Sequence, residues 1–244
     1  MKSIKTKKLI HIVFTILSLF AVQTFASKLG SVIADLFNYT AIDNNGVFMN
    51  ISVHHIIQMA VALIIIFAMS KKNRLDFHLK PKADKSGVLY TAIFAVIILM
   101  YVLISHIVGY SLGTITPYGY EINTINVVGT LGFQLFLSGT SEEILFRALP
   151  ITILVSLICK DNKTGKTFII LIASALFSVA HINWTVFPFT LSFDWFQLIY
   201  AFILGIAYGI TYIKTKSIIY PMIMHGLSNF FMIGIGYIFM VVMN

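Results

Sequence analysis

The sequence predicts an all-α, polytopic bundle of transmembrane helices, and two observations carry that prediction. The 244 residues are 58% hydrophobic and only 11% charged, whereas about a quarter of the residues in a soluble domain carry charge. The apolar residues also come in blocks long enough to cross the roughly 30 Å hydrocarbon core of a bilayer. No loop is long enough to hold a second fold, so we expect a single membrane domain.

About seven spans are expected, separated by short polar loops. The block 124–158 is too long for one simple crossing, so it is either kinked before Pro150 or broken near residues 138–141. Two full crossings of this block would make eight spans and would move a lysine-bearing loop to the other side of the membrane. We therefore favour one kinked or partly re-entrant element. The expected spans are 9–36, 51–70, 87–110, 124–158, 167–183, 196–213 and 217–241.

The lysines predict the orientation of the chain. They precede the first span and fill the loops 71–85, 159–167 and 214–216. This positive-inside pattern places the N-terminus in the cytoplasm of a multi-pass protein of the cell membrane, and it accounts for the net charge of +8 without a nucleic-acid partner. The first block resembles a signal peptide, but we interpret it as an uncleaved helix. The one cysteine, Cys159, excludes an intrachain disulfide and is expected to be interfacial.

The stretch GTSEEILFRALP (139–150) puts charge inside an apolar block. Glu143 and Arg147 are four residues apart, so they share one face of a helix and can compensate each other. Glu142 points about 100° away and is left over, because one arginine cannot neutralise two glutamates. Thr140 or Ser141 is expected to cap the start of this helix.

Two further pairs repeat the helical spacing of four residues. They are Phe177 with His181 and His225 with Asn229. Polar groups at membrane depth turn toward each other or toward a water-filled cavity, so one cavity would collect these pairs and the glutamates. The remaining histidines lack such a companion and are expected to be structural or interfacial: His11, His54, His55, His78 and His106.

Such a cavity holds the groups that hydrolysis of a peptide bond requires. A carboxylate can take a proton from water, an imidazole can share it, and further donors can stabilise the oxyanion. No serine or cysteine nucleophile with an adjacent base is evident, so Ser138, Ser141, Ser178 and Ser228 are interpreted as caps or packing hydroxyls. The cofactor stays open, since the ligand types of Glu142, Glu143, His181 and His225 would also suit a divalent metal such as zinc.

The ordered set E-E-x-x-x-R, F-x-x-x-H and H-x-x-x-N resembles the CAAX prenyl protease type II and bacteriocin-processing family, also called the Abi family of intramembrane proteases. The segment 205–229 is also similar to the last conserved segment of that family. The resemblance predicts a catalytic core at 124–240, preceded by N-terminal helices and a basic loop at 1–123. It implies that Glu142 and His181 activate water and that His225 and Asn229 stabilise the oxyanion, while Glu143, Arg147 and Phe177 support the site.

We therefore expect an intramembrane endopeptidase whose partners are the lipid bilayer and a peptide or protein substrate. The alternative is a non-proteolytic membrane partner, such as an immunity factor or a regulator of a sensor kinase, that keeps the fold. A proton-coupled carrier is disfavoured because the polar pairs are confined to the second half of the chain. The aromatic loop 183–195 is interpreted as part of an interfacial belt, with a substrate gate as the alternative. The oligomeric state is left open.

Overall fold

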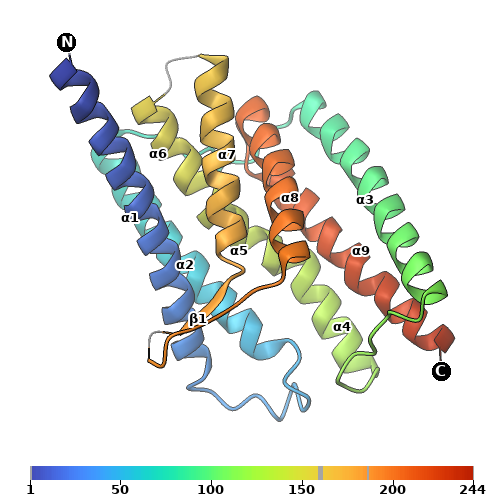
Figure 1. Ribbon diagram of the computed structural model, residues 1–244. Coiled ribbons are helices and arrows are strands. Elements are labelled where there is room, and N and C mark those ends of the chain that lie inside the picture. The colour runs from blue at the N-terminus through green and yellow to red at the C-terminus, as the bar shows by residue number, and fades with distance from the viewer. Residues whose placement is uncertain (1, 159–161, 186, 244) are drawn as a thin grey trace.

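The computed structural model describes residues 2–158, 162–185 and 187–243, and within them seven helical segments run side by side in an up-and-down bundle (Figure 1). The all-α class is thus confirmed, with one short hairpin as an addition. Cys159 lies outside the described residues. The segments are α1 (Lys2–Ala34), α2 (Met49–Asn73), α3 (Lys85–Ser111), a long helix from Thr124 to Ile158, α7 (Lys163–Val179), α8 (Trp195–Thr215) and α9 (Ile219–Met243).

Five of these helices are long and apolar enough to cross a membrane, so the chain is a multi-pass membrane protein. They are α1, α2, α3, α8 and α9, with mean hydropathies between 1.5 and 2.6 over their most apolar windows. The helix α7 has 17 residues, which is short for about 30 Å of hydrocarbon. Crossing by α7 and by the long helix stays a prediction.

The long helix is continuous but not regular. It comprises α4 (Thr124–Gly132), η1 (Phe133–Ser138), α5 (Gly139–Glu143), η2 (Ile144–Ala148) and α6 (Leu149–Ile158), of which η1 and η2 are π-helical turns. Pro150 has no N–H to donate, and the wider turn η2 lies immediately before it. The single-element prediction is confirmed, and the alternative break near 138–141 is wrong.

The predicted cap at Thr140 or Ser141 is also wrong, because the helix does not begin there. It begins at Thr124, and its cap is Asn123, whose side chain accepts a hydrogen bond from the backbone N–H of Asn126. The hydroxyls of Thr140 and Ser141 instead donate to carbonyls of the preceding turn. Sequence spacing alone could not distinguish these two uses of a hydroxyl.

The α5 segment lies at the centre of the bundle and contacts both α9 and α2. Glycines permit the close approach to α9. A Cβ atom on Gly139 would lie 2.7 Å from the backbone nitrogen of Gly226, and one on Gly226 would lie 2.5 Å from the carbonyl oxygen of Leu135. Small residues at helix crossings let backbones meet in this way. As a result, the polar residues of α9 reach those of α5.

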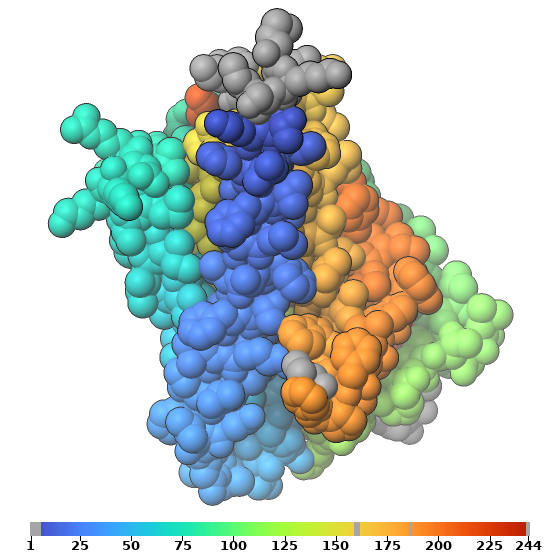
Figure 2. Space-filling view, turned by 60° about the vertical axis from the view of Figure 1, so that its left-hand side comes forward, coloured from blue at the N-terminus to red at the C-terminus, as the bar shows by residue number. Residues whose placement is uncertain are grey.

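A two-stranded antiparallel hairpin, β1 (Asn183–Thr185) and β2 (Thr190–Ser192), follows α7. It packs against α1, where the Lys28 ammonium donates to the carbonyl oxygen of Trp184 at 3.3 Å, and Figure 2 shows this contact region on the flank of α1. The exposed rings of Phe187, Phe189 and Trp195 agree with an interfacial belt. The hairpin also borders a cavity, so the gate alternative stays a prediction as well.

Candidate active site

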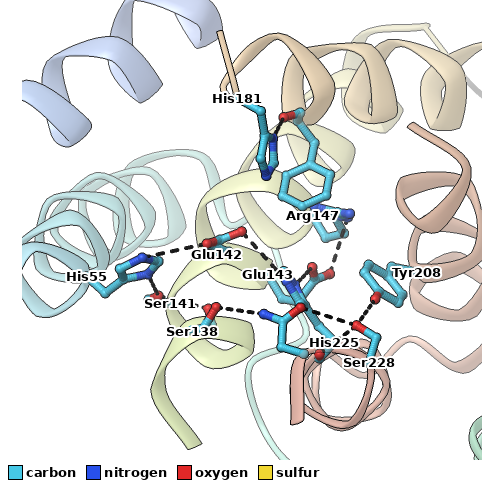
Figure 3. Close-up of polar contacts among 12 residues, drawn as sticks. His55, Ser138, Ser141, Glu142, Glu143, Arg147, His181, Tyr208, His225 and Ser228 are labelled. Atoms are coloured by element: carbon cyan, nitrogen blue, oxygen red, sulfur yellow. Dashed lines mark hydrogen bonds and ion pairs between the residues drawn. The ribbon is translucent and has the colours of Figure 1, made fainter. Parts of the chain in front are cut away.

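The two adjacent glutamates lie in different surroundings, as the helical spacing predicts (Figure 3). Arg147 Nε lies 3.2 Å from Glu143 Oε2, and both side chains are completely buried. The guanidinium also lies over the ring of Phe177, at 4.1 Å from its centroid, and 5.2 Å from that of Tyr208. Aromatic faces on two sides stabilise a buried cation where water cannot reach it. Glu143 is thus compensated.

His225 connects the two glutamates. Its Nδ1 lies 2.8 Å from Glu143 Oε1, and its Nε2 lies 3.7 Å from Glu142 Oε2. Because Glu143 is paired with Arg147, it is a carboxylate that can only accept, so Nδ1 of His225 carries the hydrogen. Tyr208 stacks on the imidazole at 5.2 Å and fixes the plane of the ring.

Asn229 lies one turn after His225 on α9. Its side-chain Nδ2 donates to the hydroxyl of Ser138 at 3.0 Å, which orients the amide. The neighbouring Ser228 donates to the carbonyl oxygen of His225 and contacts the hydroxyl of Tyr208 at 2.9 Å. Ser138 and Ser228 therefore act as packing and orienting hydroxyls, as expected.

His181 follows the C-terminal end of α7. Its Nδ1 donates to the carbonyl oxygen of Phe177 at 2.9 Å, and the two rings meet edge to face at 4.9 Å. The spacing of four residues therefore brings this pair together as predicted. His181 and Glu142 line one cavity of about 490 Å³, although no hydrogen bond joins them in the part of the chain described.

His55 of α2 is the site residue that sequence spacing missed. Its Nδ1 lies 2.7 Å from the hydroxyl of Ser141, and its Nε2 lies 3.7 Å from Glu142 Oε1. His55 has no companion at helical spacing, but it has two in the folded chain, which are 86 and 87 residues away. Two adjacent histidines and Gln58 within one apolar span were the available signal, since polar residues in spans turn inward.

The Ser141–His55 contact does not make Ser141 a nucleophile. The hydroxyl is completely buried and donates to the carbonyl oxygen of Ser138 at 3.0 Å. A nucleophilic serine must reach the substrate carbonyl. Ser141 therefore packs the helix interior and accepts the hydrogen bond from His55.

The four candidate metal ligands do not form a chelating set. Both oxygens of Glu143 are engaged, one by Arg147 and the other by His225. Across residues 2–158, 162–185 and 187–243, no three His, Cys, Asp or Glu side chains group closely enough to hold a metal ion. The site that does form is a carboxylate, Glu142, which lies between the imidazoles of His55 and His225 and lines the cavity.

Comparison with known proteins gives a family match for the second half of the chain. Residues 124–231 match the Rce1-like family, described as type II CAAX prenyl endopeptidase Rce1-like. Neither curated proteins nor solved structures gave a match. The matched segment holds both glutamates, Arg147, His181, His225 and Asn229, whereas His55 lies before it. Residues 124–231 are thus a domain of the type II CAAX prenyl endopeptidase (Rce1-like) family.

Proposed function

We propose that the protein is an intramembrane endopeptidase that hydrolyses a peptide bond in a membrane-associated peptide or protein. The observation that carries the proposal is the unequal state of two adjacent glutamates. Glu143 is completely buried against Arg147, while the Glu142 side chain keeps 17% of its surface exposed and lines the cavity. A buried structural ion pair needs only one carboxylate, whereas a general base must be accessible to water.

Each residue then has a role in hydrolysis. Glu142, with His181, takes a proton from water as the water oxygen bonds to the scissile carbonyl carbon. The resulting oxyanion accepts hydrogen bonds from the Asn229 amide and from His225 in its protonated form, whose charge Glu143 supports. When the C–N bond breaks, the proton passes from Glu142 to the departing amine. Glu142 and His181 line the cavity, His225 contacts Glu142, and Asn229 lies one turn further along α9.

The cavity favours a polar peptide segment over an isoprenoid chain. Beyond Glu142 its wall includes Gln58 of α2 and hydroxyls and amides of the hairpin. A farnesyl group would require an apolar groove, because the hydrophobic effect drives its binding. Polar residues of α1 at helical spacing also line the cavity: Gln23, Thr24, Ser27, Lys28 and Ser31.

We infer further that the N-terminus faces the cytoplasm and that the cavity opens toward the opposite side. The start of α1 and the connections α2–α3 and α8–α9 lie at one end of the bundle, and the hairpin lies at the other (Figure 1). The lysine-bearing segments 2–8, 71–85 and 214–216 coincide with the first end. Short loops and many lysines are typical of bacterial members, for which peptide maturation, bacteriocin self-immunity or processing of surface and regulatory proteins is expected.

A comparison of peptides from cells tests the proposal. Membrane and secreted peptides are compared between cells carrying the wild type, Glu142→Ala, and Glu121→Ala as a control at an exposed glutamate. We expect a species that accumulates in the Glu142 variant alone and that disappears when the wild type is restored. Identical peptide profiles in all three strains, with equal amounts of protein in the membrane, would contradict proteolysis and favour a non-proteolytic partner.

A further inference from the structure

We propose that His55 is a positioning residue for Glu142 and that Ser141 decides which imidazole nitrogen faces the carboxylate. This inference rests on the proposed function, because it assigns a role within the same hydrolytic site. It also extends the site beyond the segment 124–231 to a residue of α2. The arrangement is visible in Figure 3, where Glu142 lies between His55 and His225.

The hydrogen-bond partners of Ser141 set the tautomer of His55. A hydroxyl has one hydrogen, and that of Ser141 is donated to the carbonyl oxygen of Ser138, which can only accept. Toward His55, at 2.7 Å, the Ser141 oxygen is therefore the acceptor, and Nδ1 of His55 is the donor. Nε2 is then the nitrogen that can gain or lose a proton, and it is the one that faces Glu142.

The ring of His55 is also fixed in place by its neighbours. It meets the ring of Phe133 at 5.0 Å and that of His54 at 5.3 Å, both near edge-to-face, and the residue is 7% exposed. Packing of this kind, together with the bond to Ser141, restricts rotation of the side chain. A restrained imidazole is suited to orient a neighbouring carboxylate, as second-shell partners do for other reactive groups.

The two imidazoles hold the carboxylate from both sides. Nε2 of His55 faces Oε1 and Nε2 of His225 faces Oε2, each at 3.7 Å. These distances exceed a direct hydrogen bond, and catalytic contacts often tighten only when substrate is bound. A proton shared between His55 and Glu142 resides on Nε2 or on Oε1. In both cases the contact with His55 keeps the Glu142 carboxylate oriented while Glu142 takes the proton of water.

His106 of α3 provides a control for His55. It is also a histidine of a membrane-spanning helix, but its Nδ1 donates to the carbonyl oxygen of Val102 at 2.9 Å, and it is not among the described residues that line the cavity. The two side chains have the same chemistry and differ in their partners. An effect that depends on contact with Glu142 is therefore expected for His55 and not for His106.

The test measures cleavage by the purified full chain in lipid nanodiscs, using a synthetic copy of the peptide that accumulates in Glu142→Ala cells. His55→Asn keeps a donor near Ser141 but removes Nε2, and we expect kcat to fall about 100-fold with KM changed by less than about twofold. His55→Gln returns an amide to the position of Nε2 and should recover at least about tenfold. His106→Asn should stay within about twofold of the wild type.

The pH profile of kcat/KM gives a readout that a purely structural role would not move. The ionisable groups that face His55 are Glu142 on α5, His225 on α9 and His54 on α2. Loss of His55 removes one member of this coupled set, so the acidic limb of the profile should shift in His55→Asn and stay unchanged in His106→Asn, because His106 is not a member of the set. Equal melting temperatures of the two variants serve as the folding control.

Nitrogen-15 NMR of histidine-labelled protein checks the tautomer without substrate, with His55→Asn assigning the signal. We expect hydrogen on Nδ1 of His55 in the wild type and loss of this preference in Ser141→Ala. If Glu142→Ala is inactive while His55→Asn cleaves like the wild type, the role of His55 is overturned and the proposed function stands. If Glu142→Ala is fully active, the proposed function is wrong. The NMR measurement still tests the geometry of His55 in that case, and a hydrogen found only on Nε2 of His55 would overturn the assigned tautomer.

Discussion

At the scale of single residues, Glu143 and Arg147 form a buried ion pair beside Glu142, and its contribution to stability can be measured. The pair is completely enclosed, and Glu143 also receives the hydrogen bond from His225. Removing one member of a buried pair leaves an uncompensated charge, which costs more than removing both. The role of Arg147 can therefore be separated from that of Glu142 by a measurement of stability.

We expect Arg147→Met to lower the free energy of unfolding by about 3–5 kcal/mol. The double variant Glu143→Gln with Arg147→Met should lose less than the sum of the two single variants, because no lone charge remains buried. Unfolding of the purified protein in mixed micelles measures all three variants. A stability of Arg147→Met equal to that of the wild type would show that Glu143 does not need Arg147 to compensate its buried charge.

Asp43 performs a structural task in the loop before α2. Its carboxylate accepts hydrogen bonds from the backbone N–H groups of Val47, Phe48 and Met49 at 2.7–2.8 Å, at the start of the helix. Burial raises the pKa of the Asp43 carboxyl, but the hydrogen bonds together lower the pKa by more than burial raises it. The pKa therefore lies below the ordinary value. The ionised form is thus favoured in the folded protein.

The sign of this pKa shift predicts a pH dependence of stability. Because the folded-state pKa is lower than the unfolded value of about 3.9, the stabilisation is complete above that pH and is lost as pH falls through the folded-state pKa. Asp43→Asn should cost about 1.5–3 kcal/mol at pH 7 and progressively less below pH 4. Melting temperatures between pH 3 and pH 7 measure the difference, and exposed Asp35→Asn is the control. A difference that stays constant with pH would contradict the assignment.

At the scale of helices, the crossing of α5 and α9 determines whether the site can assemble. The two helices meet at Gly139 and Gly226, where a Cβ atom would overlap backbone atoms of the opposite helix. This crossing places His225 against both glutamates. A side chain at either glycine must separate the helices, because backbone atoms cannot rotate away.

We expect Gly226→Ala to destabilise the protein by about 1–3 kcal/mol and to abolish cleavage. Gly234→Ala on the same helix is the matched control, since its Cβ would meet only a side-chain atom of Leu131 at 3.7 Å, an ordinary contact. Thermal unfolding and peptide cleavage are measured for both variants. Wild-type activity of Gly226→Ala would mean that the close approach is dispensable.

At the scale of the whole molecule, the orientation in the membrane decides from which side a substrate reaches Glu142. We expect Asn44→Cys, in the loop between α1 and α2, to react with an impermeant maleimide in intact cells. Lys72→Cys, at the end of α2, should react only after permeabilisation, because positive charge retains its loop inside. Both positions are exposed, and Cys159→Ser supplies a cysteine-free background. The reverse labelling pattern would invert the proposed topology.

The sequence by itself determined the helical, membrane-spanning character and most of the site. Hydropathy predicts the helices because about 30 Å of hydrocarbon requires about 20 apolar residues per span. The spacing of four residues predicts local pairs such as Glu143 with Arg147 and Phe177 with His181, because neighbours on a helix are fixed by its geometry. These two pairs were therefore identified from the chain alone.

Only the tertiary structure decided which of these pairs meet and which other residues join them. The contact of His55 with Ser141 and Glu142 spans 86 and 87 residues, so no periodicity within α2 encodes it. Likewise, the sequence left open whether the chain breaks near 138–141, and the structure shows one continuous helix that packs against α9 there. Local spacing is set by the covalent chain, whereas contacts between helices are set by packing, and the site around Glu142 requires both.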